Sequence, residues 1–429
     1  MSSSASPVTS SFQSRLCAAK KLYSDGDPKA AAAAFEELLP EAANNGEEDV
    51  AEGDDSSKSE SAAGRGGRST RNVAEIHLSL AKCHKSLDDV RSAVASCNAA
   101  VSLSPKWKDP FLYRSACFQA LHQSLVETDG DSEENVERDR AEANIIVDPE
   151  ERSAAPEGCE GKTRVASVDE ALQVSREGDR IFVEKGEYYV SSSPLFICGK
   201  SVSLIGASTR DCVFNYTSPS AAAAASDAPS PSSALASRLN TFLICAGEAA
   251  PVLLKRLTFR NVCTSASTKT RFLGVAGGTV QVEDCVFEGA DGGGGDDGEG
   301  GSAADVDAIY ANARIAGALA ANYATPKVHA RFCVFDHCQS YAAFTVNNAS
   351  AVAESCYFVG SRLSAMENSR VAVENCEFAQ SGSSERTMVQ SIGASRAHIE
   401  VRGCYIHGIQ TRHVKLKVLI LSHPLGNDI

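Results

Sequence analysis

The sequence lacks a long apolar run and an excess of basic residues. A transmembrane helix needs about 20 mostly apolar residues, and the most apolar stretch of the C-terminal tail, Val418 to Leu421, is far shorter. The formal net charge is −14 at pH 7, which disfavours binding to nucleic acid or anionic membranes. No phosphate loop, zinc-ligand spacing or basic–aromatic nucleic-acid signature is present. We therefore expect no nucleic-acid partner, no membrane partner, no metal and no cofactor.

Two further absences concern the cellular compartment. The first 14 residues are rich in Ser and Thr but lack the apolar segment of a secretory signal. The 15 cysteines include no CxxC pair, so we expect a cytoplasmic protein whose thiols are reduced and buried. The N-terminus is also free of acidic residues up to Asp25 and carries Arg15, Lys20 and Lys21. Targeting to an organelle by a transit peptide is therefore the alternative.

Composition divides the chain into two folded parts. Acidic low-complexity segments cover residues 44–71 and 126–162, and neither can bury enough apolar surface to fold alone. Two shorter runs, 218–237 and 289–304, are rich in Ala, Ser, Pro or Gly and indicate flexible inserts. The predicted organisation is a disordered N-terminus at 1–11, helical repeats at 12–125, an acidic linker at 126–162, a β domain at 163–410 and an atypical tail at 411–429.

The first folded part has a repeated helical pattern. Small and aromatic residues recur with the spacing of a helix, a tight turn and a second helix, from Ala19 and Tyr23 through Gly26 to Ala31 and Phe35. The pattern returns at Leu80, Ala81, Ala93, Cys97, Ala100 and Pro105, and then at Phe111, Leu112, Phe118 and Leu121. It resembles the tetratricopeptide repeat, whose period is about 34 residues, over roughly two and a half repeats. An unrelated bundle of helical hairpins is the alternative.

The second folded part repeats one ten-residue pattern that contains a cysteine. Apolar residues stand five and three places before the cysteine, and Phe or Ile stands two places after it. Inward positions therefore alternate, skip one place and alternate again, which predicts two short strands joined at a corner. Asp284, Asn375 and Gly403 at this corner tolerate the left-handed conformation that such a turn can need. The repeats are Val252–Asn261, with Leu257 in place of cysteine, Val280–Gly289, Val328–His337, Ala351–Gly360, Val371–Gln380 and Ile399–Gly408.

Other local signals complete this prediction. A short capped helix is expected over Ser167–Ser175, ahead of the strands Arg180–Val183 and Ser201–Gly206. Tight turns are expected at Asn347–Asn348, Asn368–Ser369 and Gly393–Ala394. These features resemble a pectate-lyase-like right-handed parallel β-helix over about Thr163–His407. The predicted fold class is multidomain α plus all-β, with tetratricopeptide-like repeats followed by a pectin-lyase-like β-helix. An antiparallel sandwich is the alternative, but it would not produce one in-register cysteine column.

Two columns of side chains follow from the register. We define the inward cysteine column as Cys285, Cys333, Cys356, Cys376 and Cys404. Metal binding and reactivity are alternatives for it, but a thiol in apolar surroundings is a poor nucleophile, so core packing is favoured. We define the outward charged column as Lys255, Glu283, Arg331, Glu354, Glu374 and Arg402. Its charges would face solvent and pair weakly between coils, or would contact a polysaccharide.

The β-helical sequence lacks the clusters of acidic residues that the enzymes of the fold it resembles use for catalysis. Lyases of this fold use carboxylates for calcium and a basic residue, and the hydrolases use two or three Asp. Here Asp296–Asp297 lies in a glycine run, and His407 and Arg412 resemble a hydrolase motif without its Asp-bearing strand. We therefore assign no catalytic residue. The side chains to test first for activity are Asp305, Asp307 and Arg314.

The helical repeats offer a groove for a protein or peptide ligand. Some tetratricopeptide domains hold the C-terminal carboxylate of chaperones with Lys, Asn and Arg, whereas the matching positions here are Leu16, Lys20, Ser79, Asp109 and Tyr113. Asp109 would repel a carboxylate, so the chaperone clamp is absent. The candidate peptide-contacting residues are Lys20, Ser79, Lys82, Asp109 and Tyr113, and each could equally be an ordinary surface residue.

The sequence thus favours a non-enzymatic scaffold or adaptor with two protein-binding surfaces, the helical groove and the rigid β-helix. The β-helical part resembles intracellular adaptors of the SHC-binding and F-box-only families, although no F-box or SH2-binding motif is present. The alternative is a carbohydrate-binding or polysaccharide-cleaving protein. Residues 411–429 break the coil pattern. We expect this atypical tail to reflect a truncated chain or a different terminal exon.

Overall fold

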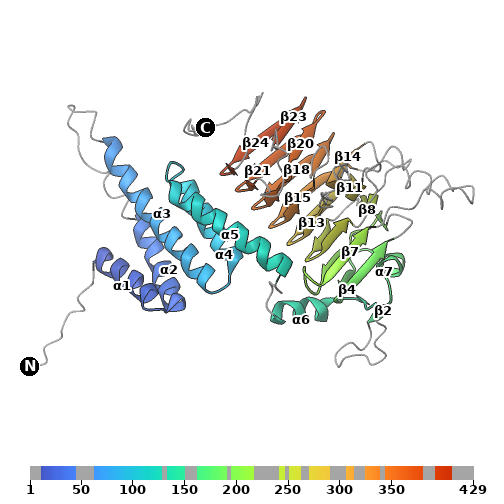
Figure 1. Cartoon of the computed structure of the whole chain (residues 1–429), viewed down its shortest axis with the longest axis horizontal. Coiled ribbons are helices and arrows are strands. Elements are labelled where there is room, and N and C mark those ends of the chain that lie inside the picture. The colour runs from blue at the N-terminus through green and yellow to red at the C-terminus, as the bar shows by residue number, and fades with distance from the viewer. Residues whose placement is uncertain are drawn as a thin grey trace, which may run out of the picture. The chain divides into compact units, whose positions relative to one another are not determined.

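The computed structural model describes residues 11–44, 62–127, 133–149, 162–190, 195–216, 241–246, 251–261, 270–289, 306–313, 324–338, 344–379 and 392–407. These residues form two compact units, a helical unit up to Leu121 and a β-helical unit from His122 (Figure 1). No helix in the described part of the chain is long and apolar enough to cross a membrane. The predicted N-terminal region 1–10, the insert 218–237, nearly all of the insert 289–304 and the tail 411–429 lie outside the described residues.

The helical unit is built from helices joined by short turns. Leu16, Phe35 and Ile76 are buried in a common core with small residues such as Ala19 and Ala31, which lets neighbouring helices approach closely. Gly26, with φ of 88°, makes the first turn, because glycine adopts this conformation without strain. The helices are α1 (Phe12–Ser24), α2 (Pro28–Asn44), α3 (Ala62–Ser86), α4 (Val90–Leu103) and α5 (Lys108–Glu127). The predicted order of helix, turn and helix is confirmed; their assignment to the tetratricopeptide family stays a prediction.

The β-helical unit contains three all-parallel sheets whose strands follow one another in turn around a coil (Figure 1). Among the described residues, the ten-stranded sheet has the order β2 (Thr163–Val165), β1 (Ile145–Val147), β3 (Arg180–Val183), β6 (Ser203–Gly206), β9 (Val252–Lys255), β12 (Thr279–Glu283), β15 (Lys327–Arg331), β18 (Ser350–Glu354), β21 (Arg370–Glu374) and β24 (His398–Arg402). The parallel β-helix predicted from the sequence is confirmed, and the crossover rule makes it right-handed.

The other two sheets complete each coil. The eight-stranded sheet contains β4 (Gly186–Val190), β7 (Cys212–Tyr216), β10 (Thr258–Asn261), β13 (Val286–Glu288), β16 (Val334–Asp336), β19 (Tyr357–Val359), β22 (Glu377–Ala379) and β25 (Tyr405–His407). The seven-stranded sheet contains β5 (Leu195–Cys198), β8 (Thr241–Ala246), β11 (Thr270–Gly277), β14 (Val306–Asn312), β17 (Phe344–Asn347), β20 (Leu363–Met366) and β23 (Ile392–Ser395). Each sheet therefore receives one strand from each complete coil.

The register of the strands follows the predicted columns. Phe259 pairs with Phe287, Phe287 with Phe335, and Phe335 with Phe358 across neighbouring parallel strands. Their rings stack with centroids 5.1, 5.2 and 4.6 Å apart. One aromatic position per coil thus builds a continuous stack through the core, which adds ring–ring attraction to the burial of apolar surface.

The corner between the ten-stranded and eight-stranded sheets has the predicted left-handed backbone. Asp284, Asn375 and Gly403 have φ of 53°, 55° and 60°. Arg256 and Phe332 adopt the same conformation, with φ of 56° and 51°, although bulky residues there are strained by about 1 kcal/mol or more. The coil geometry therefore fixes the backbone at this position whatever side chain it carries.

The turns between coils agree with the prediction in two of three cases. Asn348 and Asn368 have positive φ, at 47° and 55°. The prediction at Gly393–Ala394 is wrong, because both residues lie within β23 and the turn comes at Arg396, with φ of 56°. A Gly–Ala pair gave a turn signal there, but pairing of β23 with β20 holds it extended.

The first coil begins earlier than the sequence predicts. The segment 126–162 was expected to be an acidic linker, yet it contains the helix α6 (Glu133–Glu142) and strand β1, which lies between β2 and β3. Ile145, Ile146 and Val147 are all buried, so a three-residue apolar run suffices when strands pair on both sides. Similarly, α3 already begins at Ala62 inside the predicted insert 44–71, because a helix held by its packed part extends without a new nucleation cost.

The predicted capping helix is present as α7 (Val168–Val174). The Ser167 hydroxyl accepts a hydrogen bond from the backbone N–H of Glu170 at 3.2 Å, which satisfies a donor of the first turn. Buried Val168, Ala171 and Leu172 place its apolar side in the main core. This helix contacts β1, β2 and β5 and so covers one end of the β-helix.

Candidate functional site

A groove in the helical unit brings together four of the five residues predicted to contact a peptide. Lys20 comes from α1, Ser79 and Lys82 from α3, and Asp109 from the first turn of α5. The groove encloses about 450 Å³. Its lining consists of Lys20, Tyr23, Phe35, Arg71, Glu75, Leu78, Ser79, Lys82, Trp107 and Asp109.

Tyr113, the fifth predicted residue, does not belong to this lining. The Lys85 ammonium lies 5.6 Å from the centre of its ring, and burial raises the pKa of the Tyr113 hydroxyl above its ordinary value. Asp109 and Tyr113 are four residues apart in α5 and so lie on the same side of that helix. The Tyr113 ring instead contacts Lys85 of the neighbouring helix α3.

The centre of the groove is electrically neutral. The Lys20 ammonium lies 2.5 Å from a carboxylate oxygen of Glu75, and both side chains are about half exposed, at 45% and 42%. An exposed pair of this kind contributes little to stability, but it cancels both charges locally. The Ser79 hydroxyl donates to the Glu75 carbonyl at 2.9 Å, one helical turn back along α3.

One end of the groove carries a stack that the sequence did not reveal. The Arg71 guanidinium lies 3.7 Å above the centre of the Trp107 ring. The indole N–H of Trp107 donates to Asp109 at 2.9 Å. The ring therefore orients an arginine on its face and a carboxylate at its edge. Arg71 was missed because it closes the segment 44–71, which composition assigned to an insert. The available signal for Trp107 was its position two residues after Pro105, which belongs to the repeated helical pattern.

The other end of the groove is formed by Lys82 and Tyr23. Lys82 is exposed, and no carboxylate among the described residues lies within ion-pair distance of it. The Tyr23 hydroxyl shares a hydrogen bond of 3.2 Å with Ser86, which fixes the ring beside this end of α3. Within the described part of the chain, the groove thus combines an unpaired ammonium with an aromatic ring in one lining.

The outward charged column of the β-helix is engaged in pairs rather than presented as a continuous site. Arg331 lies 3.6 Å from Glu354, and Arg402 lies 3.4 Å from Glu374. In the strand register, Glu283 lies opposite Lys255 on one side and opposite Arg331 on the other. The Lys255 ammonium, however, turns 3.4 Å toward Asp139 of α6. The interpretation of Lys255 as part of an open solvent-facing column is therefore wrong.

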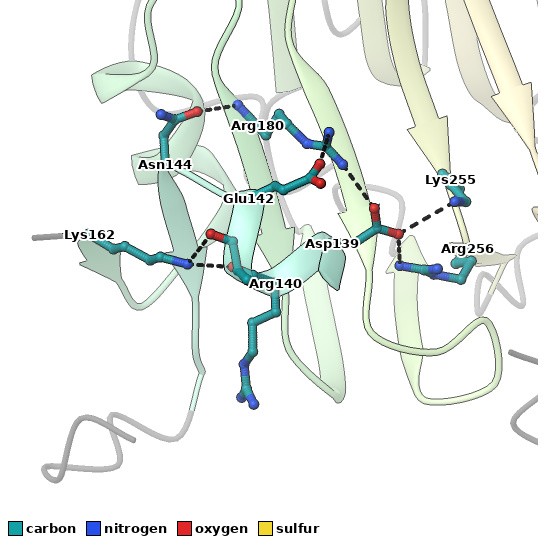
Figure 2. Close-up of polar contacts among 9 residues, drawn as sticks. Asp139, Arg140, Glu142, Asn144, Lys162, Arg180, Lys255 and Arg256 are labelled. Atoms are coloured by element: carbon teal, nitrogen blue, oxygen red, sulfur yellow. Dashed lines mark hydrogen bonds and ion pairs between the residues drawn. The ribbon is translucent and has the colours of Figure 1, made fainter. Parts of the chain in front are cut away.

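Asp139 is the centre of a partly buried ionic network (Figure 2). Its carboxylate accepts hydrogen bonds from Arg256 at 2.7 Å and from Arg180 at 2.9 Å, besides the contact with Lys255. Burial alone raises the pKa of Asp139, but the charges and hydrogen bonds of Arg256 and Lys255 outweigh it and hold the pKa below its ordinary value. The network ties α6 to the ends of β3 and β9.

The inward cysteine column forms a repeated set of thiol contacts. Cys356 donates to the carbonyl of Ala330, and Cys376 to that of Ala353, at 3.4 and 3.3 Å. Cys285, Cys333, Cys356 and Cys376 have no exposed surface, while Cys404 is half-buried. Burial raises the pKa of Cys285 and Cys356. No group of three or more potential metal ligands is found among the described side chains.

Of the carboxylates marked for a test of catalysis, only Asp307 is described. It is fully buried on β14, and its carboxylate lies 3.6 Å from Arg271 on the neighbouring strand β11. The Arg271 guanidinium also lies 4.3 Å from the centre of the Tyr310 ring. Asp305, Arg314, the pair Asp296–Asp297 and Arg412 lie outside the described residues.

Comparisons with known proteins add little beyond the fold. No protein-family model matches the chain, and no curated protein matches it. Two solved structures of pectin methylesterase in complex with a hexasaccharide are similar to it, with TM-scores of 0.37 and 0.38, at 12% and 13% identity, over 62% of this chain and 79% and 81% of theirs. A pectin methylesterase from Aspergillus niger has a TM-score of 0.35 at 13% identity, over 58% of this chain and 77% of its own. Likeness at this level carries no argument about activity.

Proposed function

We propose that this protein is a non-enzymatic interaction scaffold whose helical unit, of tetratricopeptide type, binds an extended peptide of a protein partner. The observation that carries this proposal is the groove of about 450 Å³, which gathers Lys20, Ser79, Lys82 and Asp109 from three helices. Binding sites combine aromatic surface with a few placed polar groups, and this groove offers both. The β-helix supplies a long rigid surface, as in intracellular adaptors of the SHC-binding and F-box-only type.

The single tryptophan of the chain makes this proposal testable. Trp107 lines the groove, so its fluorescence should change when a peptide library is titrated into the full-length protein. Replacing Tyr23 by Ala should weaken the response, because the ring forms one end of the groove. Replacement of exposed Leu112 by Ala, on α5 outside the lining, is the control. A protein whose Trp107 signal responds to no peptide would refute the proposal.

A carbohydrate ligand for the β-helix is the second candidate. Two of the solved structures similar to this chain are pectin methylesterases bound to a hexasaccharide, and this names the ligand class to test. Arg271, Asp307 and Tyr310 lie together on β11 and β14. The test is incubation with polyuronates, esterified and free, with and without calcium. Cleavage or ester hydrolysis that is lost in Asp307→Asn would replace the scaffold proposal by an enzymatic one.

We further propose a reducing compartment, the cytoplasm, with an organelle reached by a transit peptide as the alternative. Twelve cysteines of the described part are free thiols, and four members of the inward column are fully buried. Fractionation of cells that produce the full-length chain would distinguish the two compartments.

A further inference from the structure

The two ends of the groove carry cations on one face of the same helix. Arg71 and Lys82 both line the groove and are 11 residues apart in α3. Eleven residues make about three helical turns, so the two side chains project from one face about 16 Å apart along the axis. An extended chain advances about 3.3 Å per residue. Successive side chains of an extended chain point to opposite sides, so two side chains that both face α3 are separated by an even number of residues. The shortest even separation that spans this distance is six residues, about 20 Å.

Neither of these two cations has a carboxylate partner among the described residues that line the groove. Arg71 rests on the face of Trp107, a contact that leaves guanidinium N–H donors at its rim, and Lys82 is exposed. The third cation, Lys20, is already neutralised by Glu75 at 2.5 Å. The positive ends are therefore separated by a neutral centre, and a ligand with two negative charges at matching spacing would complement them.

Asp109 reduces the charge complementarity between the groove and a ligand with two negative charges. Its carboxylate accepts the indole N–H of Trp107 at 2.9 Å and so lies near the Arg71 end. It repels a ligand carboxylate there, which makes the Arg71 contact weaker than the guanidinium alone would allow. Among the described residues that line the groove, Glu75 and Asp109 are the acidic ones, and Glu75 is already paired.

We infer that the groove selects an extended peptide segment with two acidic side chains six residues apart, one at Arg71 and the other at Lys82. This inference rests on the proposed peptide-binding function and adds the chemical pattern of the partner. The ligand is an internal segment: recognition comes from its side-chain carboxylates, and its C-terminal carboxylate is not needed.

The test uses the full-length protein and fluorescein-labelled peptides with amidated C-termini. One peptide carries Glu at positions 1 and 7, a second carries Glu at 1 and 3, a third carries Gln at 1 and 7, and a fourth carries Lys at 1 and 7. Anisotropy should show the first peptide binding about tenfold more tightly than the other three, because one charge-assisted contact is worth about that factor. The preference should shrink between 50 and 500 mM salt.

Variants of the protein test the ligand contacts of Arg71 and Lys82 separately. Arg71→Gln and Lys82→Gln should each weaken the first peptide about five- to tenfold, and Arg71→Lys should lose less than Arg71→Gln because it keeps the charge. Asp109→Asn should strengthen binding about threefold by removing the repulsion. Lys21→Gln is the matched control, since Lys21 is an exposed lysine of α1 outside the lining.

The outcomes separate the inference from the function on which it rests. If the Gln or Lys peptide binds as tightly as the Glu peptide and changes the fluorescence of Trp107, peptide binding stands and the acidic pattern is overturned. If no peptide changes that fluorescence, both are overturned. Equal binding of both Glu spacings would overturn the six-residue separation, and a loss on Lys21→Gln equal to that on Lys82→Gln would show attraction by net charge alone.

Discussion

The thiols of the inward cysteine column act as hydrogen-bond donors as well as space-filling groups. Each thiol donates to the carbonyl that lies three places before the equivalent residue of the preceding coil, as Cys333 does to Val282 and Cys404 to Val373. Cys356 also donates its backbone N–H to the Cys376 sulfur at 3.4 Å. This corner needs a small residue that fills space in the core and also donates a hydrogen bond to the preceding coil, and cysteine does both.

Replacement of one thiol in this column should therefore destabilise the β-helix. Cys356→Ala removes the donor to Ala330 and leaves a cavity of one sulfur atom, which we expect to lower the free energy of unfolding by about 1–2 kcal/mol. The measurement is urea unfolding followed by far-UV circular dichroism. Trp107 lies in the helical unit, so its fluorescence identifies the transition of that unit separately.

Cys17→Ala is the control for this measurement, because Cys17 is an exposed free thiol on α1. Its replacement should leave both transitions unchanged within about 0.5 kcal/mol. Equal stability of Cys356→Ala and the unmodified protein would show that the thiol contacts contribute nothing beyond the volume of a methyl group.

At the scale of elements, α6 is held by charge rather than by a large apolar face. Asp139 contacts Arg180, Lys255 and Arg256, and Lys162 donates to carbonyls at the end of α6, including that of Ala141 at 2.9 Å (Figure 2). Arg256 is 1% exposed and also donates to the Gly206 carbonyl at 2.8 Å. The strained backbone of Arg256 thus places its guanidinium between α6 and β6.

Removal of the Asp139 charge should release α6 from the sheet. Asp139→Asn removes the carboxylate charge that buried Arg256 shares with Lys255 and Arg180, and breaking a buried ion pair costs about 3 kcal/mol or more. Hydrogen exchange should become faster in α6, β3 and β9, and the urea midpoint of the β-helical unit should fall. Glu137→Gln is the control: Glu137 is 61% exposed and touches only Arg140 of this network at 3.3 Å, so its loss should cost less than about 0.5 kcal/mol.

The pH dependence of this anchor follows from the lowered pKa of Asp139. A carboxylate whose pKa is lower in the folded state stabilises fully above its unfolded value, about 4, and loses that contribution as the pH falls through the folded value. The stability difference between the unmodified protein and Asp139→Asn should therefore be constant from pH 7 to 5 and should shrink below about pH 4. A difference that instead grew in acid would contradict the assigned ion pairs.

At the scale of the whole molecule, the free cysteines divide by exposure. Cys17 is exposed, Cys198 and Cys404 are half-buried, and the other described thiols are buried in the cores of the two units. Burial raises the pKa of Cys338 as well as that of Cys285. Since the thiolate is the reactive form, buried thiols should react only when their unit unfolds.

Native-state alkylation should display this division. Brief treatment with iodoacetamide, followed by peptide mass spectrometry, should label Cys17 first, Cys404 more slowly, and Cys285, Cys333, Cys356 and Cys376 together only after unfolding. Simultaneous labelling of the four is expected because they belong to one continuous core. Labelling of one column member under native conditions would show that its coil opens alone.

The sequence by itself determined the β-helix, because inward and outward positions repeat with every coil and parallel stacking forces equivalent residues into register. Cys285, Phe287 and Asp284 could be placed on the core, the aromatic stack and the left-handed corner from spacing alone, and so could the capping helix after Ser167. The predicted helices followed likewise from local periodicity, whereas the four groove residues were named through the resemblance to tetratricopeptide domains.

Only the tertiary structure decided contacts between segments that are distant along the chain. An acidic composition concealed α6 and β1, because Asp139 is acceptable inside the fold only beside Arg256 and Arg180, which lie far away in sequence. For the same reason Arg71 was assigned to an insert until its contact with Trp107 appeared. Periodicity reports which face a residue occupies, but a charge or a ring acquires its role from the partner that folding brings to it.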